Sequence, residues 1–279
     1  MSPTHLICGT HTLRLDRPLI MGIVNITPDS FSDGGQFLQR NRAIQQAKRL
    51  LAGGADIIDI GGESTRPGAA EVGLQEECDR VLPVLESLLA EGVPISVDTQ
   101  KSAVMLAAIR LGASMINDVN ALQAPGAMAA CAASNVSVCL MHKQGTPGTM
   151  QQAPQYENVV AEVRDFLLTR ADACIAAGIA RERIVIDPGF GFGKTVAHNF
   201  SLLRDLGVLI QSGLPVLAGF SRKASLGVVT GRDADDRLAA SLATALIAMQ
   251  NGAKIIRVHD VKETVDVLKV WQALIENVK

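Results

Sequence analysis

Short apolar segments and longer amphipathic segments alternate along most of the chain. Eight short runs are apolar at nearly every position, which is typical of strands buried on both faces of a parallel sheet. The predicted strands are Leu19–Val24, Asp56–Ile60, Pro94–Val97, Ser114–Ile116, Val136–Met141, Ile184–Ile186, Pro215–Ala218 and Lys254–Val258. The segments between them predict helices over Arg42–Leu51, Gln75–Leu89, Lys101–Leu111, Glu157–Ala177, His198–Leu206, Leu238–Asn251 and Val261–Asn277.

Strands that alternate with helices in this way predict an α/β fold with a parallel sheet. The strand number of eight favours a closed (β/α)8 TIM barrel, although an open doubly wound sheet with as many strands would give a similar pattern. We expect a single domain over residues 1–279, with the core barrel from about residue 18 to residue 279. The segment Leu6–Leu13 precedes the first barrel strand and predicts a short hairpin at the barrel bottom.

Composition narrows the class of protein. The 279 residues are 48% hydrophobic but only 3% aromatic, so branched aliphatic side chains must fill the core, as they do in barrels. A net charge of -2 without a basic stripe argues against a nucleic-acid partner. The sequence shows no membrane span and no signal peptide, and its five cysteines form no CxxC pair. We therefore expect a cytoplasmic protein with reduced, mostly buried thiols and no membrane partner.

Polar residues follow every predicted strand, at the positions where barrel enzymes carry their working side chains. They are Asn25, Glu63–Gly68, Asp98–Thr99, Asn117–Asp118, Met141–His142, Asp187–Gly189, Ser221–Lys223 and Arg257–Asp260. Each group alone could equally cap a helix or form a turn. Burying so many polar and charged groups at one barrel mouth costs several kcal/mol unless they pair or meet a ligand. The whole set therefore predicts a site for a polar ligand.

The residue types suggest what this ligand looks like. Asp98, Asn117 and Asp187 could accept hydrogen bonds from the N–H edge of a heterocycle, and Lys223 could donate to a ring carbonyl. Arginine forks match phosphate geometry, so a second set suits an anion. This set consists of Asn25, Arg66, Arg257 and His259. An ion pair between Arg257 and Asp260 is the alternative, which we favour less because Arg257 ends an apolar strand.

Two segments rich in Gly, Pro and small polar residues, Asn25–Gly35 and Gly61–Gly68, are expected to close over the site. A third segment, residues 187–195, ends in Gly-Lys-Thr like a Walker A loop. That motif requires glycine where this chain has Pro188, so we reject nucleotide binding. Its glycines would instead let the backbone approach a flat ligand, with Phe192 at the wall.

Four motifs resemble the signatures of the dihydropteroate synthases: Met21–Gly35, Asp187–Lys194, Ser221–Lys223 and Arg257–Asp260. The resemblance extends over almost the whole chain in the order of the family. It implies a homodimeric (β/α)8-barrel transferase of folate biosynthesis that uses Mg2+. Such an enzyme condenses (7,8-dihydropterin-6-yl)methyl diphosphate with 4-aminobenzoate, through a pterin cation-like intermediate, to give 7,8-dihydropteroate and pyrophosphate. Sulfonamides are expected to compete with 4-aminobenzoate.

The resemblance also assigns roles to individual residues. The implied pterin contacts are Asp98, Asn117, Asp187 and Lys223. The implied diphosphate contacts are Asn25, Thr65, Arg66, Arg257, Val258 and His259, of which Asn25 also binds the metal. The implied 4-aminobenzoate pocket consists of Phe31, Thr65, Pro67, Phe192, Ser221 and Lys223. The catalytic set is Asp98, Asp187, Lys223, Arg257 and His259.

Two alternatives share the pterin pocket. A methyltetrahydrofolate–corrinoid methyltransferase would need neither the diphosphate residues nor the Ser221–Lys223 motif. A non-catalytic pterin-binding paralogue would be expected to have lost Arg257 and His259 or the two closing segments, and this chain retains them. For the homodimer we expect an interface on Leu238–Asn251 and Val261–Asn277, because the stretch 242–249 is more apolar than one buried helix face requires.

Overall fold

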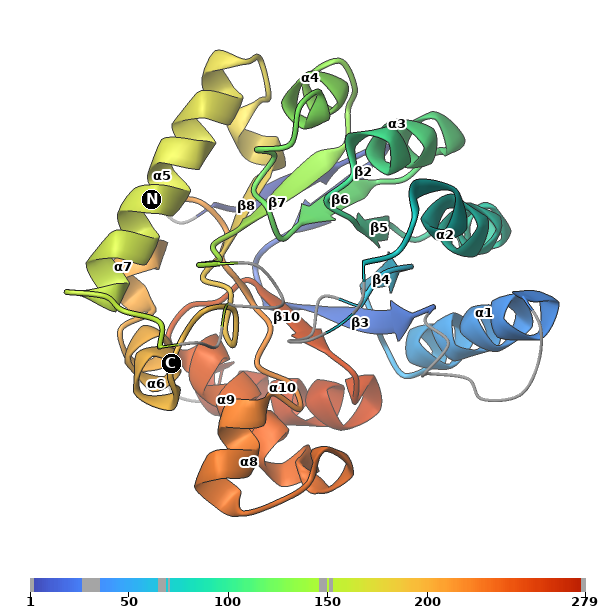
Figure 1. Cartoon of the computed structure of the whole chain (residues 1–279). Coiled ribbons are helices and arrows are strands. Elements are labelled where there is room, and N and C mark those ends of the chain that lie inside the picture. The colour runs from blue at the N-terminus through green and yellow to red at the C-terminus, as the bar shows by residue number, and fades with distance from the viewer. Residues whose placement is uncertain are drawn as a thin grey trace.

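The computed structural model describes residues 3–26, 36–64, 69, 71–145, 150 and 153–276. Within these ranges, parallel strands form an eight-stranded sheet in the order β8-β7-β6-β5-β4-β3-β10-β9. A parallel bridge between Ile186 in β8 and Val216, just before β9, joins the two ends of the sheet and closes the barrel. The predicted (β/α)8 barrel is therefore confirmed, and Figure 1 shows helices surrounding the strands.

All eight predicted strands occur, with ends shifted by one or two residues. The barrel strands are β3 (Leu19–Asn25), β4 (Ile57–Gly61), β5 (Ile95–Asp98), β6 (Met115–Asp118), β7 (Ser137–Met141), β8 (Ile184–Asp187), β9 (Leu217–Ala218) and β10 (Ile255–Val258). Most side chains on both faces of these strands are buried, because helices cover the outside of the barrel and side chains from the other strands fill its interior. This explains why the strands read as continuous apolar runs.

The predicted helices are also present. The longer ones are α1 (Gln36–Ala52), α2 (Leu74–Leu88), α3 (Ser102–Leu111), α5 (Val159–Ala176), α6 (Val196–Arg204), α9 (Leu238–Gln250) and α10 (Val261–Glu276). The short helices α4 (Ala127–Ala132), α7 (Gly207–Ile210) and α8 (Ala224–Thr230) were not predicted. They have two turns or fewer, which is too short to establish an amphipathic period. Among the described segments, no helix is both long and apolar enough to cross a bilayer.

A hairpin closes the bottom of the barrel, as the sequence predicted. Its strands β1 (His5–Cys8) and β2 (His11–Arg14) pair antiparallel. Leu6 and Cys8 are fully buried and pack against side chains near the starts of the barrel strands. These barrel residues are Leu19, Met21, Ile57, Met115, Cys139, Val185, Leu217 and Ile255. The opposite end of the barrel, where the strands finish, carries the predicted polar residues.

Candidate active site

Strand register brings the predicted polar residues of neighbouring strands to one level. Asn25 pairs with Gly61, Gly61 with Asp98, and Asp98 with Asn117 along the parallel ladder. Asp187 ends β8 beside Met141 of β7. Because parallel strands all finish at the same end of a barrel, these side chains line its C-terminal mouth.

Arg257 is the centre of a buried polar network at this mouth. Its Nε donates to Asp59 Oδ2 at 2.6 Å and its Nη2 donates to Asp98 Oδ2 at 2.8 Å. Asn117 Nδ2 donates to the same oxygen of Asp59 at 3.3 Å. Arg257 therefore pairs with acids of β4 and β5 and not with Asp260, so the surface ion pair considered as the alternative does not form.

Asp59 was missed by the sequence reasoning. It lies in the middle of β4, is fully buried, and its Oδ1 has no hydrogen-bond partner among the described residues. The signal in the sequence was a carboxylate inside an otherwise apolar strand, which is costly to bury without a paired charge.

Burial and charge set the protonation of this network. Burial raises the pKa of Asp98 to about 7, and the neighbouring Arg257 opposes the shift. Burial also lowers the pKa of Arg257, but the carboxylates of Asp59 and Asp98 outweigh it and the net shift is upward. Arg257 therefore stays charged, while the Asp98 carboxyl can hold or release a proton near neutral pH.

Asp187 ends β8 and starts a glycine-rich turn. Its Oδ1 accepts the N–H of Gly189 at 2.7 Å, and burial raises the pKa of its carboxyl. Gly189 has a φ of +67°, and a Cβ there would lie 1.9 Å from the carbonyl oxygen of His142. Only glycine fits, so the backbone of this turn is fixed against the end of β7.

The same turn brings Phe192 under Lys223. Lys223 Nζ lies 4.2 Å from the centroid of the Phe192 ring, a cation–π contact. The stem of Lys223 passes over Gly191, where a Cβ would lie 3.2 Å from Lys223 Cδ. Lys223 also lies close enough to Asp187 for its charge to lower the pKa of that carboxyl, against the effect of burial. Predicted pterin and 4-aminobenzoate residues are thus in contact.

Ser221 and His259 meet at the ends of β9 and β10. Ser221 Oγ lies 3.1 Å from His259 Nδ1 and accepts the backbone N–H of His259 at 3.3 Å. Between Ser221 and Lys223, Arg222 has a φ of +56° and forms an ion pair with Asp260 at 2.5 Å. Ser221 therefore lies directly beside His259, a residue predicted to bind the diphosphate.

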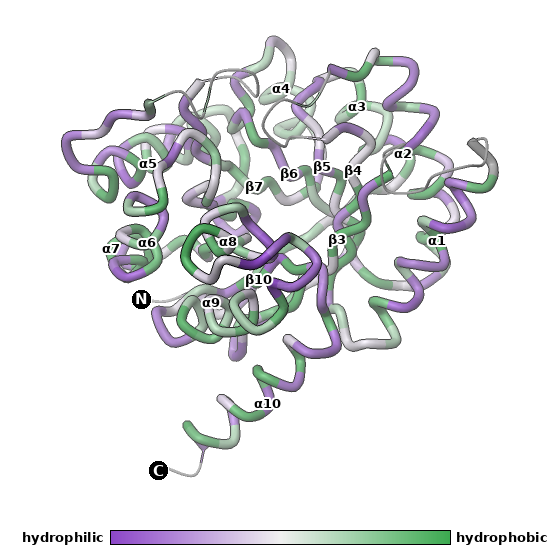
Figure 2. Tube along the Cα trace, turned by 60° about the horizontal axis from the view of Figure 1, so that its bottom comes forward, coloured by the Kyte–Doolittle hydropathy of each residue, from purple (hydrophilic) through white to green (hydrophobic). Residues whose placement is uncertain are grey.

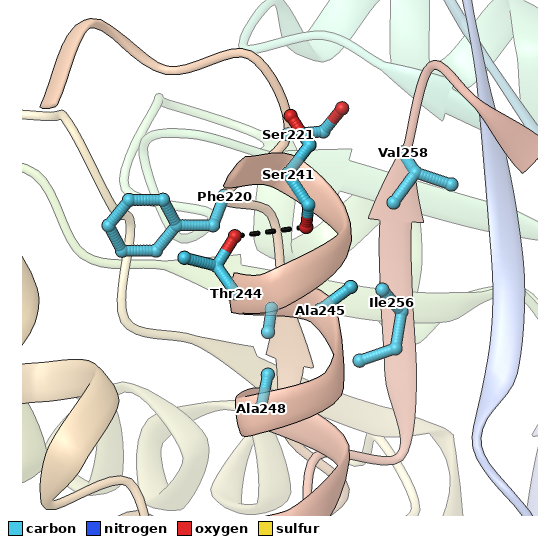
Figure 3. A pocket seen from close by; sticks show the side chains of 9 residues that line it. Phe220, Ser221, Ser241, Thr244, Ala245, Ala248, Ile256 and Val258 are labelled. Atoms are coloured by element: carbon cyan, nitrogen blue, oxygen red, sulfur yellow. Dashed lines mark hydrogen bonds between the residues drawn. The ribbon is translucent and has the colours of Figure 1, made fainter. Parts of the chain in front are cut away.

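A small cavity lies behind this turn, between β9, β10 and α9. Figure 3 shows Ser221, Ser241 and Thr244 around it, together with Ala245 and Ala248 of α9. Its volume of about 10 Å3 is about the space of one water molecule. It is therefore too small for a substrate.

Two other predicted polar groups have structural roles. Asp118 accepts the N–H groups of Asn120 and Leu122, each at 2.7 Å, and so holds the turn after β6. Thr99 Oγ1 accepts the N–H of Lys101 just before α3. For these two residues the turn or cap alternative was the better interpretation.

Four predicted site residues, Phe31, Thr65, Arg66 and Pro67, lie outside the described residues. In the part of the chain that is described, no group of three or more His, Cys, Asp or Glu is arranged to hold a metal ion. Asn25 is partly buried at the end of β3, beside Gly61. All five cysteines are free and four of them are buried, as expected for reduced thiols.

Comparison with known proteins places the chain in a family. Residues 21–259 match the model of a family described as pterin binding enzyme. The chain is 52% identical over 269 residues to the dihydropteroate synthase of Haemophilus influenzae, covering 96% of this chain and 98% of the relative.

Solved structures of dihydropteroate synthases are also similar to this chain. The dihydropteroate synthase of Xanthomonas albilineans with 4-aminobenzoic acid is 53% identical, with a TM-score of 0.93 and 98% of both chains covered. That of Burkholderia cenocepacia complexed with 7,8-dihydropteroate is 48% identical, with a TM-score of 0.91 and coverage of 100% of this chain and 99% of the other.

Proposed function

The chain belongs to the dihydropteroate synthases, pterin-binding transferases, and we propose that its reaction takes place among the polar side chains at the C-terminal mouth of the barrel. The reaction joins (7,8-dihydropterin-6-yl)methyl diphosphate to 4-aminobenzoate and releases pyrophosphate. The observation that carries this assignment is the polar cluster of Asp98, Asn117, Asp187 and Arg257 from four strands, with Asn117 and Asp187 buried and Arg257 paired to Asp98 at 2.8 Å. The corrinoid-dependent alternative is not favoured, because the most similar relatives are dihydropteroate synthases over nearly their full length.

The pterin is proposed to bind against the carboxyl and amide groups. Asp187 uses one oxygen for Gly189, and a carboxylate has further lone pairs for the N–H edge of a heterocycle. Asp98 and Asn117 are adjacent on the ladder and supply acceptor oxygens beside it. Lys223, held over Phe192, supplies donors for a ring carbonyl. This pattern of acceptors and donors complements a pterin and would not complement an aliphatic substrate.

The diphosphate is proposed to bind near Arg257 and His259. The guanidinium of Arg257 has five N–H donors, and its two carboxylate partners leave donors for a phosphate oxygen. Ser221 Oγ accepts the backbone N–H of His259 and lies 3.1 Å from its Nδ1, so we propose that His259 meets the anion through Nε2 of its imidazole. Val258 is the last residue of β10 and lies between Arg257 and His259 in the sequence, so all three lie at the end of this strand. From the sequence, Asn25, Thr65 and Arg66 are proposed to complete this subsite.

Mg2+ is proposed as the metal, with Asn25 as its protein ligand. Mg2+ prefers oxygen donors and commonly takes only one or two from the protein, with water and substrate phosphates supplying the rest. One amide oxygen at the end of β3 fits such a site, and this explains why the described residues need no cluster of metal ligands. When bound, the ion would offset the charge of the leaving pyrophosphate.

Residues of the chain would then carry the chemistry as follows. Arg257 and His259 stabilise the departing pyrophosphate, because a guanidinium held in place by carboxylates and a nearby imidazole offer fixed hydrogen-bonding groups to the developing negative charge. The carboxylates of Asp98 and Asp187 stabilise the positive charge that develops on the pterin. Phe192 holds the aromatic ring of 4-aminobenzoate, whose amine attacks the pterin methylene, and Ser221 is proposed to bind its carboxylate. Sulfonamides, which resemble 4-aminobenzoate, should compete at this subsite.

A second copy of the chain is the proposed partner, docked on α9 and α10. These helices form a groove of about 470 Å3, with an apolar lining that includes Leu242, Leu246, Val267, Val270 and Trp271. Val270 is 73% exposed and Leu274 60%. In Figure 2 the end of α10 projects beyond the body of the barrel. An exposed apolar surface on the two segments for which a dimer was expected favours self-association.

Product analysis tests the proposed function. The protein is incubated with the pterin diphosphate, 4-aminobenzoate and Mg2+, and the products are separated by chromatography and identified by mass spectrometry. We expect dihydropteroate only when both substrates are present. Methyl transfer from methyltetrahydrofolate to a corrinoid protein, or pterin binding without product, would overturn the proposal.

A further inference from the structure

A lysine that the mechanism does not use is buried directly behind the site. Lys194, at the end of the glycine turn after β8, is only 2% exposed. Its Nζ lies 2.9 Å from the carbonyl oxygen of Gly189 and 3.0 Å from that of Phe192. It also lies 3.0 Å from His142 Nδ1 and 3.3 Å from the carbonyl oxygen of His142. An ammonium group has three N–H donors, so these four acceptors use all of them.

The bonds of Lys194 reach two proposed substrate contacts. Gly189 accepts from Lys194 through its carbonyl and donates its own N–H to Asp187 Oδ1 at 2.7 Å. Phe192 accepts from Lys194 through its carbonyl, and its ring lies under Lys223. Lys194 therefore reaches the Asp187 carboxylate through Gly189, and it binds Phe192 directly through the backbone carbonyl of that residue. The position of each depends on a carbonyl that Lys194 binds.

The turn itself supplies a partner for one of these carbonyls, because the N–H of Phe192 donates to the Gly189 carbonyl at 3.1 Å. It contains Gly189, Gly191 and Gly193, all with positive φ, and such a backbone neither continues a strand nor begins a helix. Unpaired buried carbonyls are costly, and one group collects those of Gly189 and Phe192. The fact that this group is a lysine is informative, because burying an ammonium is more costly than burying the N–H of a neutral side chain.

Burial and neighbouring charges set the ionisation of this cluster. Burial, together with the charge of Lys194, lowers the pKa of His142 to about 3, so its imidazole is neutral and Nδ1 can accept from Lys194. Burial lowers the pKa of Lys194 to about 7, while the charge of Asp187 raises it and that of Lys223 lowers it further. The charged side chain that shifts the pKa of His142 is therefore Lys194, and those that shift the pKa of Lys194 are Asp187 and Lys223.

We propose that Lys194 is a positioning residue that holds Asp187 and Phe192 in place together, and so sets the affinities of the pterin and 4-aminobenzoate subsites in common. The inference rests on the proposed function of those two residues. It differs from a merely structural role, in which Lys194 would stabilise the fold without affecting either substrate.

The test compares two buried cations that bind carbonyl groups. Lys194→Met removes the one behind the site. Arg183→Met is the matched control, because Arg183 is also buried and donates to the carbonyl oxygens of Val136 and Cys131, each at 2.8 Å, at the start of β8. Both variants should lose thermal stability. Only Lys194→Met should raise KM for both substrates, each by about tenfold or more, which corresponds to about 1.4 kcal/mol in each binding step.

Isothermal titration with a 6-hydroxymethylpterin measures the pterin subsite without turnover and should show the same loss of affinity for Lys194→Met. Wild-type KM values in Lys194→Met, or an equal rise in both variants, would overturn the proposal. If Lys194→Met does not fold, Lys194→Gln serves instead, because its shorter, neutral side chain has two N–H donors where the ammonium has three and so loses part of the support of the turn. Wild-type KM values in Lys194→Gln would also overturn it. The wild-type enzyme is assayed in parallel, so that absence of turnover there counts against the proposed function and not against the role of Lys194.

Discussion

Asp59 holds Arg257 from two strands away in the sheet: Nε of the arginine donates to Oδ2 of the aspartate at 2.6 Å. The two residues are 198 positions apart in the sequence and come from β4 and β10. Asp59 is fully buried and receives Asn117 at the same oxygen, so Asp59 joins a proposed pterin contact to a proposed diphosphate contact. Asp59 can in this way determine where two proposed substrate-binding groups lie.

We expect Asp59→Asn to weaken substrate binding more than it weakens the fold. The neutral amide loses a charge-assisted hydrogen bond, worth about 1.5–3 kcal/mol, and leaves Arg257 held by Asp98 alone. KM for the pterin diphosphate should rise by about tenfold or more. Steady-state kinetics at saturating 4-aminobenzoate measures this directly.

Asp56→Asn is the control for Asp59→Asn. Asp56 precedes the same strand and forms a two-bond ion pair with Arg17, at 2.6 and 2.9 Å, at the opposite end of the barrel. It should reduce thermal stability without changing KM. If the two variants change KM equally, the effect of Asp59 is on the fold and not on Arg257.

Asp187→Asn should remove most of the pterin affinity while the barrel stays folded. Its carboxylate would face N–H groups of the pterin, and an amide would present its own N–H groups to them. The lost charge-assisted bonds are worth about 1.5–3 kcal/mol each. Calorimetric titration with a 6-hydroxymethylpterin, alongside circular dichroism, is the measurement. Unchanged affinity would mean that Asp187 serves only its turn with Gly189.

The barrel could be predicted from the sequence because strands buried on both faces are apolar throughout, and this pattern is independent of partners. The ion-pair partners of Arg257 could not be predicted from the sequence. Asp260 is the acid nearest to Arg257 in the sequence, yet Asp260 pairs with Arg222, and Arg257 pairs with acids of β4 and β5 that the pairing of β10 with β3 brings near. Ion pairs between distant strands depend on the register and curvature of the sheet.

Lys194 shows a different limit. Its Gly-Lys-Thr context suggested a phosphate-binding loop, which the spacing excluded, but nothing in the spacing indicated what the lysine does bind. Its acceptors are backbone carbonyls whose directions depend on three left-handed glycines and on the end of β7. Such contacts follow from the path of the backbone and not from residue types.

His142 should make the fold sensitive to acid. The unfolded chain takes up a proton on this histidine near its ordinary pKa of 6.5, whereas burial holds the pKa in the folded chain at about 3. Between these values the unfolded state binds more protons, so this group makes the free energy of unfolding increase with pH and its contribution is lost as pH falls towards 3.

Urea unfolding at several pH values from 4 to 7 checks this, with His142→Gln for comparison. The wild type should lose more stability than the variant as pH falls over this range. The carboxyls of Asp98 and Asp118, whose pKa values are raised, change stability in the opposite direction but do so in both proteins. Equal slopes for the two proteins would show that His142 is protonated in the folded state.

Charges placed on the groove between α9 and α10 should separate the proposed dimer. Val270→Glu combined with Leu274→Glu puts two carboxylates on exposed apolar positions, beside Glu263 and Asp266 of the same lining. Light scattering should give the mass of a dimer for the wild type and of a monomer for the variant. Leu106→Glu, at an exposed apolar position on α3, should leave the dimer intact. A monomeric wild type at micromolar concentration would refute the interface.

The most direct test of the whole account is the stoichiometry of one reaction. Purified protein is mixed with (7,8-dihydropterin-6-yl)methyl diphosphate, 4-aminobenzoate and Mg2+, and pyrophosphate and dihydropteroate are both quantified over time. The account predicts that they form in equal amounts, that neither forms at a comparable rate when Mg2+ is chelated, and that Asp187→Asn reduces both together. Pyrophosphate released without dihydropteroate, or no release from the wild type, would contradict it.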